Sequence, residues 1–541
     1  MTPVADLRAA VEAAAAGLAN GGAPKSRPTL ERPKQADHGD YATNAALVLA
    51  PVLKAPPREV AERLGGALRD RLGDALERVE VAGPGFLNLF LADPWYVEAL
   101  DWVLAAGDGF GGGGTTPALR VNIEFVSANP TGPLTAASGR HAAFGDALAR
   151  VLQFAGHSVG REYYFNDAGT QIEKLGESIR ARARGEEVPE GGYVGDYVSE
   201  LAAAIPGAAD IDAHELARLG VELMFERIKG TLRAYRVEYD VFFNEGSLHE
   251  GTPSAIERGI ERLSEQGHLY RSEGALWLRT TDFGDDKDRV VERSTGQTTY
   301  FAADVAYAEN KLERGFDLLV IPLGSDHHGY VARLKANMAA LGADPDRLEI
   351  PILQFVHIVE GGERASMSKR RGDFITLDAL IQDIGVDATR YFMLSRTHDS
   401  TIDLDLDLAR SQSAENPVYY VQYAHARIAS VLRKAGEARV QRALAARGAG
   451  VELHPSERAL VKKLLAFPEE VAEAADRRAP HRIAAYALEL AQVFTAFYRD
   501  CQVVGAEPAA REDWRLRLCV VTQRTIARAL DLLGVHAPDE M

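Results

Sequence analysis

The chain has 541 residues, of which 46% are hydrophobic and 26% are charged, and its formal net charge is −17. This length predicts about three or four domains of ordinary globular composition, and the sequence has no apolar run of about 18 residues that would predict a membrane span. The N-terminus has no basic segment before an apolar core, so we expect no signal peptide; the two cysteines, Cys501 and Cys519, exclude a disulfide framework and a four-cysteine zinc site and fit a cytoplasmic protein.

Residues 1–110 are predicted to form an N-terminal α+β domain. The first residues have helical spacing, and VEVAGPGFLNLFLA predicts two strands around a Gly-Pro-Gly turn. The segment that follows, GDGFGGGGTTP, contains four consecutive glycines, which have high backbone entropy and no side chains to pack. We therefore expect a linker and a domain boundary at this point.

Residues 115–396 show strand-like runs in alternation with helical ones. RVNIEFV, GREYYFN, FDLLVIPLG and EIPILQFVHIV read as strands, and AAFGDALARVLQFAG and YVARLKANMAALG as helices. This alternation predicts a Rossmann-like parallel sheet with crossover helices. A helix-rich segment at about residues 176–248 is predicted to be an insertion into this domain.

Residues 397–541 are predicted to form an all-α C-terminal bundle, because the sequence after Asn416-Pro417 is helical almost throughout. From Pro417 onward Lys and Arg outnumber Asp and Glu, although the whole chain is acidic. A locally basic helical domain can bind a polyanion while the rest of the chain keeps the protein soluble. A solvated helical surface is the alternative.

The turn ANPTGPLTAAS joins a predicted strand to a predicted helix. A helix N-terminus at the end of a parallel strand is a usual site for a nucleotide phosphate. Glu124 and Asn129 stand at the end of the strand, where a carboxylate and an amide can hold a cationic or amine group. The alternative is a capped turn without a ligand.

Tyr300 and Asp304 are four residues apart and therefore share one face of a predicted helix. An acid on an apolar, aromatic face suits a guanidinium or ammonium ligand, because a planar carboxylate can pair with a guanidinium through two hydrogen bonds. An exposed helix-cap aspartate is the alternative.

Two further loops carry polar or charged residues. In VIPLGSDHHGY, Gly324 permits close backbone approach and Asp326 can bind ribose hydroxyls, while His327 and His328 suggest a metal only weakly, since no third ligand stands nearby. In GGERASMSKRRGDF, residues Lys369, Arg370 and Arg371 can form a mobile cationic lid over phosphates. A solvated basic turn is the alternative for the second loop.

Taken in order, these motifs resemble a class I aminoacyl-tRNA synthetase, and specifically the arginyl-tRNA synthetase family of bacterial type. The resemblance covers nearly the whole chain, and it is carried by HGDYATN, GPGFLNLFL, EFVSANPTGPL, EYYFNDAGTQIEKLGES, TYFAADVAYA, GSDHHGYVARLKA, SMSKRRGDFITLDALIQDIGVDATRYFML, NPVYYVQYAHARI and ALDLLGVHAPDEM. It implies a ligase that joins L-arginine and ATP into arginyl-adenylate and passes the arginyl group to the 3′ end of tRNA(Arg). Mg²⁺ would accompany ATP, and no protein-bound metal is expected. The resemblance also suggests a monomer.

The resemblance assigns residues to each ligand. For arginine it implies Glu124, Ser127, Asn129, Tyr300 and Asp304, with His328 where other members have a glutamine. For ATP it implies Pro130, Thr131, Gly132, Pro133, Leu134, Thr135, Ser138, Gly324, Asp326, Val356, His357, Met367 and Lys369. For catalysis it implies Thr135, Ser138, Ser368 and Lys369. For the tRNA it implies Asp40 and Tyr41 at the elbow, and Tyr419, Tyr420, Tyr423, Arg427 and Met541 around the anticodon.

Two motifs depart from the family pattern. The tetrapeptide Thr135–Ser138 stands where the "HIGH" motif has two histidines and a glycine, and Ser366 replaces the first lysine of the "KMSKS" loop, although Lys369 keeps the second. We expect the Thr135 and Ser138 hydroxyls, the helix N-terminus, Lys369 and a cation near Arg140 or His141 to hold the phosphates. Rival interpretations are a synthetase-like protein that binds arginine or tRNA without catalysis, and another nucleotidyltransferase on the same fold.

Overall fold

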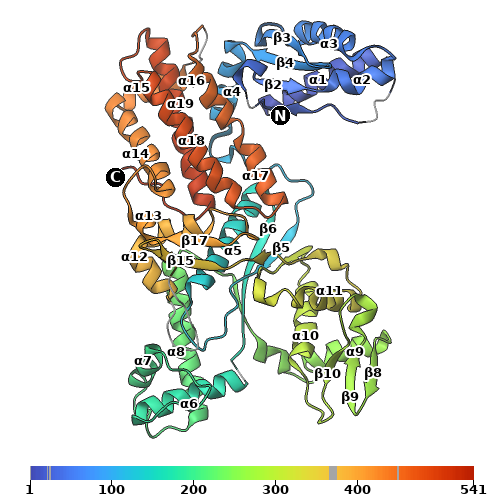
Figure 1. The fold of residues 1–541 in the computed structure, drawn as a ribbon, viewed down its shortest axis with the longest axis vertical. Coiled ribbons are helices and arrows are strands. Elements are labelled where there is room, and N and C mark those ends of the chain that lie inside the picture. The colour runs from blue at the N-terminus through green and yellow to red at the C-terminus, as the bar shows by residue number, and fades with distance from the viewer. Residues whose placement is uncertain are drawn as a thin grey trace.

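A computed structural model describes residues 2–20, 22, 26–33, 35–167, 169–364, 375–446 and 450–541. The N-terminal domain, blue in Figure 1, is an antiparallel sheet in the order β1-β2-β4-β3 covered by helices. The two predicted strands around the Gly-Pro-Gly turn pair as β3 and β4. The elements of this domain are α1 (Pro3–Ala19), β1 (Leu30–Glu31), β2 (Tyr41–Thr43), α2 (Ala45–Leu53), α3 (Pro57–Leu72), β3 (Leu76–Ala82), β4 (Phe86–Leu91) and α4 (Asp93–Ala106).

The glycine-rich segment after α4 leads into the central domain, and two of its glycines are tightly packed. A Cβ on Gly111 would lie 2.5 Å from the ring of Phe467, and a Cβ on Gly112 would lie 2.7 Å from the carbonyl oxygen of Phe154. The amide of Gly113 donates to the same Phe154 carbonyl at 2.8 Å. These glycines therefore allow a close approach of two backbones, besides joining two domains.

The central domain is a five-stranded, all-parallel sheet in the order β13-β11-β5-β6-β7. The chain runs from β5 through α5 to β6 on one side, whereas β11 lies on the other side of β5. The carboxyl ends of β5 and β11 therefore flank the point where the strand order reverses, which is where open parallel sheets bind ligands. The elements are β5 (Arg120–Glu124), α5 (Ala136–Ala155), β6 (Ser158–Phe165), β7 (Val241–Asn244), α10 (Tyr300–Glu313), β11 (Leu318–Val320), α11 (Tyr330–Ala340) and β13 (Leu348–Glu349).

Two units interrupt this sheet, and both lie at the lower end of the molecule in Figure 1. The first consists of α6 (Thr170–Arg184), α7 (Asp196–Ala204) and α8 (Ala213–Ala234), where the sequence predicts a helical insertion. The predicted insertion extends too far at its C-terminal end, because β7 pairs with β6 and forms the edge of the central sheet. The second unit, which the sequence did not predict, consists of a helix and an antiparallel sheet. Its elements are α9 (Ala255–Glu265), β8 (Leu269–Ser272), β9 (Ala275–Leu278) and β10 (Arg289–Glu292).

Shorter strands connect the central sheet to the C-terminal helices. β15 pairs in parallel with β17 and antiparallel with β16, and β12 pairs with β14. The elements are β12 (Leu323–Gly324), β14 (Ile352–Leu353), β15 (Val356–Glu360), β16 (Glu363–Arg364), α12 (Leu377–Met393), β17 (Ile402–Asp405) and α13 (Leu406–Arg410).

The remaining helices form the C-terminal bundle, orange to red in Figure 1. They are α14 (Pro417–Ala435), α15 (Glu437–Ala445), α16 (Pro455–Leu464), α17 (Phe467–Asp476), α18 (His481–Asp500) and α19 (Ala509–Leu532). The bundle contacts the N-terminal domain through ion pairs, one of which joins Arg458 to Asp93 at 2.7 Å. No helix within the described ranges is long and apolar enough to cross a bilayer.

A buried arginine joins three parts of the chain. Arg390, in α12, is ion-paired at 2.5 Å with Asp146 of α5. The same guanidinium donates to the carbonyl of Leu533 at 2.8 Å and to that of Tyr235 at 2.9 Å. The helix that begins at the predicted phosphate site is thus tied to the end of α8 and to the end of the bundle.

Candidate active site

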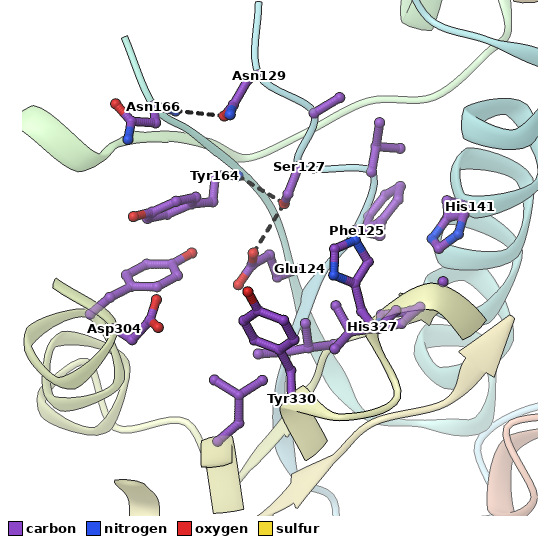
Figure 2. A pocket seen from close by; sticks show the side chains of 18 of the residues that line it. Glu124, Phe125, Ser127, Asn129, His141, Tyr164, Asn166, Asp304, His327 and Tyr330 are labelled. Atoms are coloured by element: carbon purple, nitrogen blue, oxygen red, sulfur yellow. Dashed lines mark hydrogen bonds between the residues drawn. The ribbon is translucent and has the colours of Figure 1, made fainter. Parts of the chain in front are cut away.

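A cavity of about 960 Å³ opens at the carboxyl ends of β5 and β11. Figure 2 shows Glu124 near its centre, with Asp304 and Tyr164 on one side and His141 and His327 on the other. The structure brings together the following predicted residues in its wall: Glu124, Ser127, Asn129, Thr135, Ser138, Tyr300, Asp304, Gly324 and Asp326. The walls come from β5, α5, α10 and the segment after β11, as the strand order predicts.

The backbone that leaves β5 is strained and is held by hydrogen bonds. Val126 and Ser127 have φ values of 70° and 42°, which non-glycine residues rarely adopt. The hydroxyl of Tyr163 donates to the carbonyl of Ala128 at 2.8 Å and accepts from its amide at 3.2 Å. The hydroxyl of Ser127 donates to Glu124 at 3.0 Å. This turn fixes Glu124 and the residues after it at the cavity wall.

One face of α10 supplies a large part of the cavity wall. Tyr300, Asp304, Tyr307 and Lys311 all line the cavity, and their spacing of four, three and four residues places them on one side of a helix. Only the first two of these were predicted from the sequence. The same helical spacing was available in the sequence for Tyr307 and Lys311.

The acidic side chains at this end of the cavity have altered proton affinities. Burial raises the pKa of Asp304 to about 7, and the nearby Glu245 and Glu124 carboxyls add to the shift. Burial also raises the pKa of Glu245, although its hydrogen bond from the Tyr164 hydroxyl, at 2.7 Å, opposes this. Two buried carboxyls that resist ionisation together form a site that favours a cationic ligand. Glu245 follows β7, in a segment that the sequence analysis assigned to the insertion.

Two ion pairs neutralise the other carboxylates beneath the cavity. The ammonium of Lys311 lies 2.5 Å from Glu124, and Arg314 donates to both oxygens of Glu162, at 2.6 and 2.9 Å. Burial opposes ionisation of Glu162, but Arg314, Lys311 and the Tyr307 hydroxyl together hold its pKa below the usual range. Among the described residues at this end of the cavity, Asp304 and Glu245 are the carboxyls without an ion pair.

The other end of the cavity is the N-terminus of α5. Thr135 is the N-cap, and its hydroxyl oxygen accepts from the amide of Ser138 at 3.3 Å. The amide of Ala136 donates to the carbonyl of Ile375 at 3.0 Å. Two of the first amides of the helix therefore already have partners, so this N-terminus is less open to an anion than the sequence suggested.

The two cations expected beside this helix end have other roles. Arg140 is buried and donates to the carbonyls of Gln354, Thr397 and Ser400 at 2.6, 2.9 and 2.8 Å, so it supports the backbone outside the cavity. His141 does line the cavity. Burial, followed by the charge of Arg140, lowers the pKa of His141 to about 4, so the imidazole is neutral at neutral pH and is not a cation. Neither residue supplies the positive charge that was expected.

The loop after β12 reaches the cavity through Gly324, Asp326 and His327. A Cβ on Gly324 would lie 2.5 Å from the Asp326 carboxylate, so this carboxylate folds back over the glycine. His328, predicted near arginine, is exposed and does not line the cavity; His327 lines it instead. Within the described part of the chain, no group of three or more His, Cys, Asp or Glu side chains could hold a metal ion.

Of the remaining residues predicted for ATP, those that the structure describes do not line the cavity. Residues 130–134 lie beside it, and the carbonyl of Thr131 accepts a hydrogen bond from Tyr197 of α7 at 3.0 Å. Val356 and His357 pair with Ile402 and Asp403 in the sheet of β15 and β17. Ser366, Met367, Ser368, Lys369, Arg370 and Arg371 lie outside the described residues.

Comparisons with known proteins agree along the whole chain. Three family models match: "Arginyl tRNA synthetase N terminal domain" over residues 5–91, "tRNA synthetases class I (R), catalytic domain" over residues 221–429, and "DALR anticodon binding domain" over residues 421–541. An arginine–tRNA ligase of Frankia alni is 48% identical over 100% of both chains. The chain belongs to the arginyl-tRNA synthetase family.

Solved structures of arginyl-tRNA synthetases have the same fold. One from Campylobacter jejuni has a TM-score of 0.77 and 33% identity, with 83% of this chain and 100% of the other covered. One from Thermus thermophilus has a TM-score of 0.74 and 24% identity, with 99% of each chain covered. The predicted architecture, a parallel-sheet catalytic domain between an N-terminal α+β domain and a C-terminal helical domain, is confirmed.

In this arginyl-tRNA synthetase family member, the two residues predicted to contact the tRNA elbow have structural partners. Asp40 accepts a hydrogen bond from the Leu91 amide at 2.7 Å and forms an ion pair with Lys462 at 2.8 Å. Tyr41 is buried in β2 with its ring edge against Trp95. Tyr41 therefore presents no side chain to a partner, because alternation in a strand turns it into the core.

The predicted anticodon residues form an aromatic surface on α14 and α18. The rings of Tyr419 and Tyr423 are stacked with centroids 6.1 Å apart, and the Arg427 guanidinium lies 4.7 Å from the Tyr423 ring and 5.2 Å from that of Tyr498. Tyr498, from α18, is exposed and was not predicted. Tyr420 is partly buried against the core, and its hydroxyl donates to Thr495 at 3.0 Å. Met541 is exposed at the end of the chain.

Proposed function

We propose that the cavity binds L-arginine at the end lined by Asp304 and Glu245 and ATP at the N-terminus of α5. Membership of the family makes the chain an arginine–tRNA ligase. The observation that carries the assignment of the two ends is the pair of buried, unpaired carboxyls on one side of the cavity, where a guanidinium can replace the protons that burial favours. Tyr300 and Glu124 extend this end toward the rest of the substrate.

The chemistry of the first step requires little proton transfer. An oxygen of the arginine carboxylate attacks the α-phosphorus of ATP, and the bond between that phosphorus and the oxygen bridging to the β-phosphate breaks. Pyrophosphate leaves, and arginyl-adenylate remains. Because the attacking carboxylate is already ionised, catalysis depends on positioning and on stabilising negative charge. This fits a cavity that has fixed carboxyls at one end and hydroxyls at the other.

In the second step a hydroxyl of the terminal adenosine of tRNA(Arg) attacks the carbonyl carbon of the adenylate. The ester bond to the ribose forms, the bond to AMP breaks, and the hydroxyl proton is lost. We propose that the Thr135 and Ser138 hydroxyls and Lys369, with Ser368 and Met367 in the same loop, act on the phosphates, while Gly324 and Asp326 face the ribose. Mg²⁺ enters with ATP as part of the substrate.

We propose that the exposed faces of Tyr419, Tyr423, Arg427 and Tyr498 bind the anticodon region of the tRNA. Aromatic rings and a guanidinium suit unpaired bases, which stack on such faces. We further propose a monomer that works in the cytoplasm, with domain boundaries near residues 110 and 397. Because the whole chain has a net charge of −17, we expect the basic groups at this surface to be important for binding the polyanionic tRNA.

The experiment that tests this function is aminoacylation of unfractionated tRNA with each amino acid in turn. We expect charging with arginine alone, dependent on ATP. Charging with another amino acid would contradict the assignment of the acidic end. Arginine- and tRNA-dependent pyrophosphate exchange separates a ligase from a protein that only binds these molecules.

A further inference from the structure

Lys311 is a buried ammonium directly beneath the proposed arginine site. Its side chain is 1% exposed, and its Nζ lies 2.5 Å from Oε2 of Glu124 and 4.3 Å from the centre of the Tyr307 ring. Glu124 is itself 10% exposed at the side chain. A lysine is rarely buried to this extent unless it is paired. The burial of both partners makes this an internal ion pair in the wall of the cavity.

The Glu124 carboxylate remains able to bind a ligand, whereas the Lys311 ammonium is shielded from solvent. Oε2 of Glu124 accepts from Lys311, and Oε1 accepts from the Ser127 hydroxyl at 3.0 Å. An ionised carboxylate offers about four lone-pair sites, so Glu124 can accept further donors from the cavity. Lys311 lies against Glu124 and the ring of Tyr307 at the cavity wall, and because its side chain is 1% exposed it acts on a ligand mainly through its partner Glu124.

We propose that Lys311 is a positioning residue that, with Ser127, holds the Glu124 carboxylate in place, so that Glu124 can bind the α-ammonium group of arginine. This inference rests on the proposed function. It assigns a role to a residue that does not itself contact the substrate.

The physical reason is the cost of a lone charge in the cavity wall. A buried carboxylate without a cation takes up a proton, and a neutral carboxyl is a poor partner for an ammonium group. Arg314, another cation of the same helix, is committed to both oxygens of Glu162. Lys311 is the cation that forms the ion pair with Glu124.

Other groups around the pair make it sensitive to charge. The titratable or charged groups that face Glu124 and Lys311 from the neighbouring elements are Glu162 and Tyr164 on β6, Tyr239 after α8, Glu245 after β7, and Asp304, Tyr307 and Arg314 on α10. The carboxyls among them add negative potential, which the Lys311 ammonium offsets beside Glu124. Loss of Lys311 should therefore disturb the position of the Glu124 carboxylate and appear first in KM for arginine.

The test is Lys311→Met in the full chain, which removes the ammonium group and keeps an unbranched side chain one atom shorter. Pyrophosphate exchange at saturating tRNA gives KM for arginine and for ATP separately. We expect KM for arginine to rise by at least about 10-fold, because the Glu124 carboxylate is no longer held in place. KM for ATP should stay within about twofold, because the ATP end of the cavity is unchanged.

Three further variants make the result specific. Lys311→Arg keeps a cation and should recover most of the arginine affinity. Glu124→Gln combined with Lys311→Met should be no worse than Glu124→Gln alone if Lys311 acts through Glu124. Lys335→Met is the matched control. It removes a half-exposed lysine of the neighbouring helix α11 that is ion-paired with Asp346, and it should leave both KM values unchanged.

Two outcomes would overturn the inference: an arginine KM in Lys311→Met that equals the wild-type value, or an increase in KM that is equal for arginine and ATP. If Lys311→Met does not fold, Lys311→Arg and the double variant decide, since the double variant leaves no buried lone charge. Failure of the wild-type chain to charge tRNA with arginine would instead contradict the proposed function, so the two failures are distinct.

Discussion

The two ends of the cavity are built in different ways. At the arginine end, the functional groups are side chains fixed by buried partners: Glu124 by Lys311 and Ser127, and Glu245 by Tyr164. At the ATP end, they are the hydroxyls of Thr135 and Ser138 and a helix terminus whose first amides are partly occupied. The cations proposed for this end belong to the segment around Lys369.

The difference follows from the chemistry of the two ligands. A guanidinium is recognised by carboxylates in a fixed geometry, and burial of those carboxylates strengthens the interaction of each one with the cation. A triphosphate changes charge and shape during the reaction, so its partners must follow it. We expect mutations at the arginine end to act on arginine binding alone, and mutations at the ATP end to act on ATP alone.

The strongest test of this contrast is Asp304→Asn. We expect KM for arginine to rise by about 100- to 1000-fold, because loss of one member of a buried charge pair costs about 3 to 4 kcal/mol. KM for ATP should change little in the same pyrophosphate-exchange assay. Asp346→Asn, at an exposed aspartate on the surface, serves as the control. An equal effect on both substrates would show that the two ends are not separate.

The reciprocal test is the double variant Thr135→Ala, Ser138→Ala. We expect kcat/KM for ATP to fall by about 30-fold, since a hydrogen bond to a charged group contributes about 1.5 to 3 kcal/mol. The arginine KM should hold. Thr135→Ser keeps both the hydroxyl and the helix cap and is the matched control, in which kcat/KM for ATP should change little. Unchanged pyrophosphate exchange in the double variant would refute a role for the hydroxyls.

A third test uses pH on the wild-type chain. Asp304 has a pKa of about 7 in the empty cavity, and a guanidinium binds its ionised form. Above pH 7 the carboxylate is ready to bind; below pH 7 binding must first remove a proton. We therefore expect KM for arginine to rise by up to about tenfold for each pH unit below 7. Asp304→Asn should abolish this dependence, whereas a slope that persists in the variant would assign it to another group.

The smallest effect is expected far from the cavity, at the aromatic surface of α14 and α18. Tyr498→Ala should raise KM for tRNA by about 5- to 10-fold, because stacking of one base contributes about 1 to 3 kcal/mol. Tyr420→Phe is the matched control, since it removes only the hydroxyl that bonds Thr495. A larger effect of Tyr420→Phe than of Tyr498→Ala would reverse the assignment. Neither variant should change KM for arginine or ATP at saturating tRNA.

The sequence predicted the layout of the fold because its signals were strong and local. Alternating apolar runs and helical spacing were sufficient for the parallel sheet and the terminal helices. The strands β8, β9 and β10 were missed, since they are four residues each and partly exposed. The position of β7 was missed because a strand at the edge of a sheet needs little apolar sequence; both Val241 and Phe242 are exposed.

The candidate site was predictable where one element carries it and was not where distant segments meet. Asp304 and Tyr300 follow from helical spacing on α10 alone. Glu245 did not follow, because its place beside Asp304 depends on the pairing of β7 with β6. Arg140 was misjudged for the same reason: its partners, the carbonyls of Gln354, Thr397 and Ser400, are more than two hundred residues away.

The buried Arg390 bears on how the chain can be divided. Its partners are Asp146 in α5, Tyr235 at the end of the first inserted unit, and Leu533 at the end of the bundle. A fragment that stops after the catalytic domain would leave this guanidinium without the Leu533 carbonyl and would uncover the apolar surfaces around it. Cutting this protein into separate functional pieces therefore disturbs the support of the ATP site even when every residue of that site is retained.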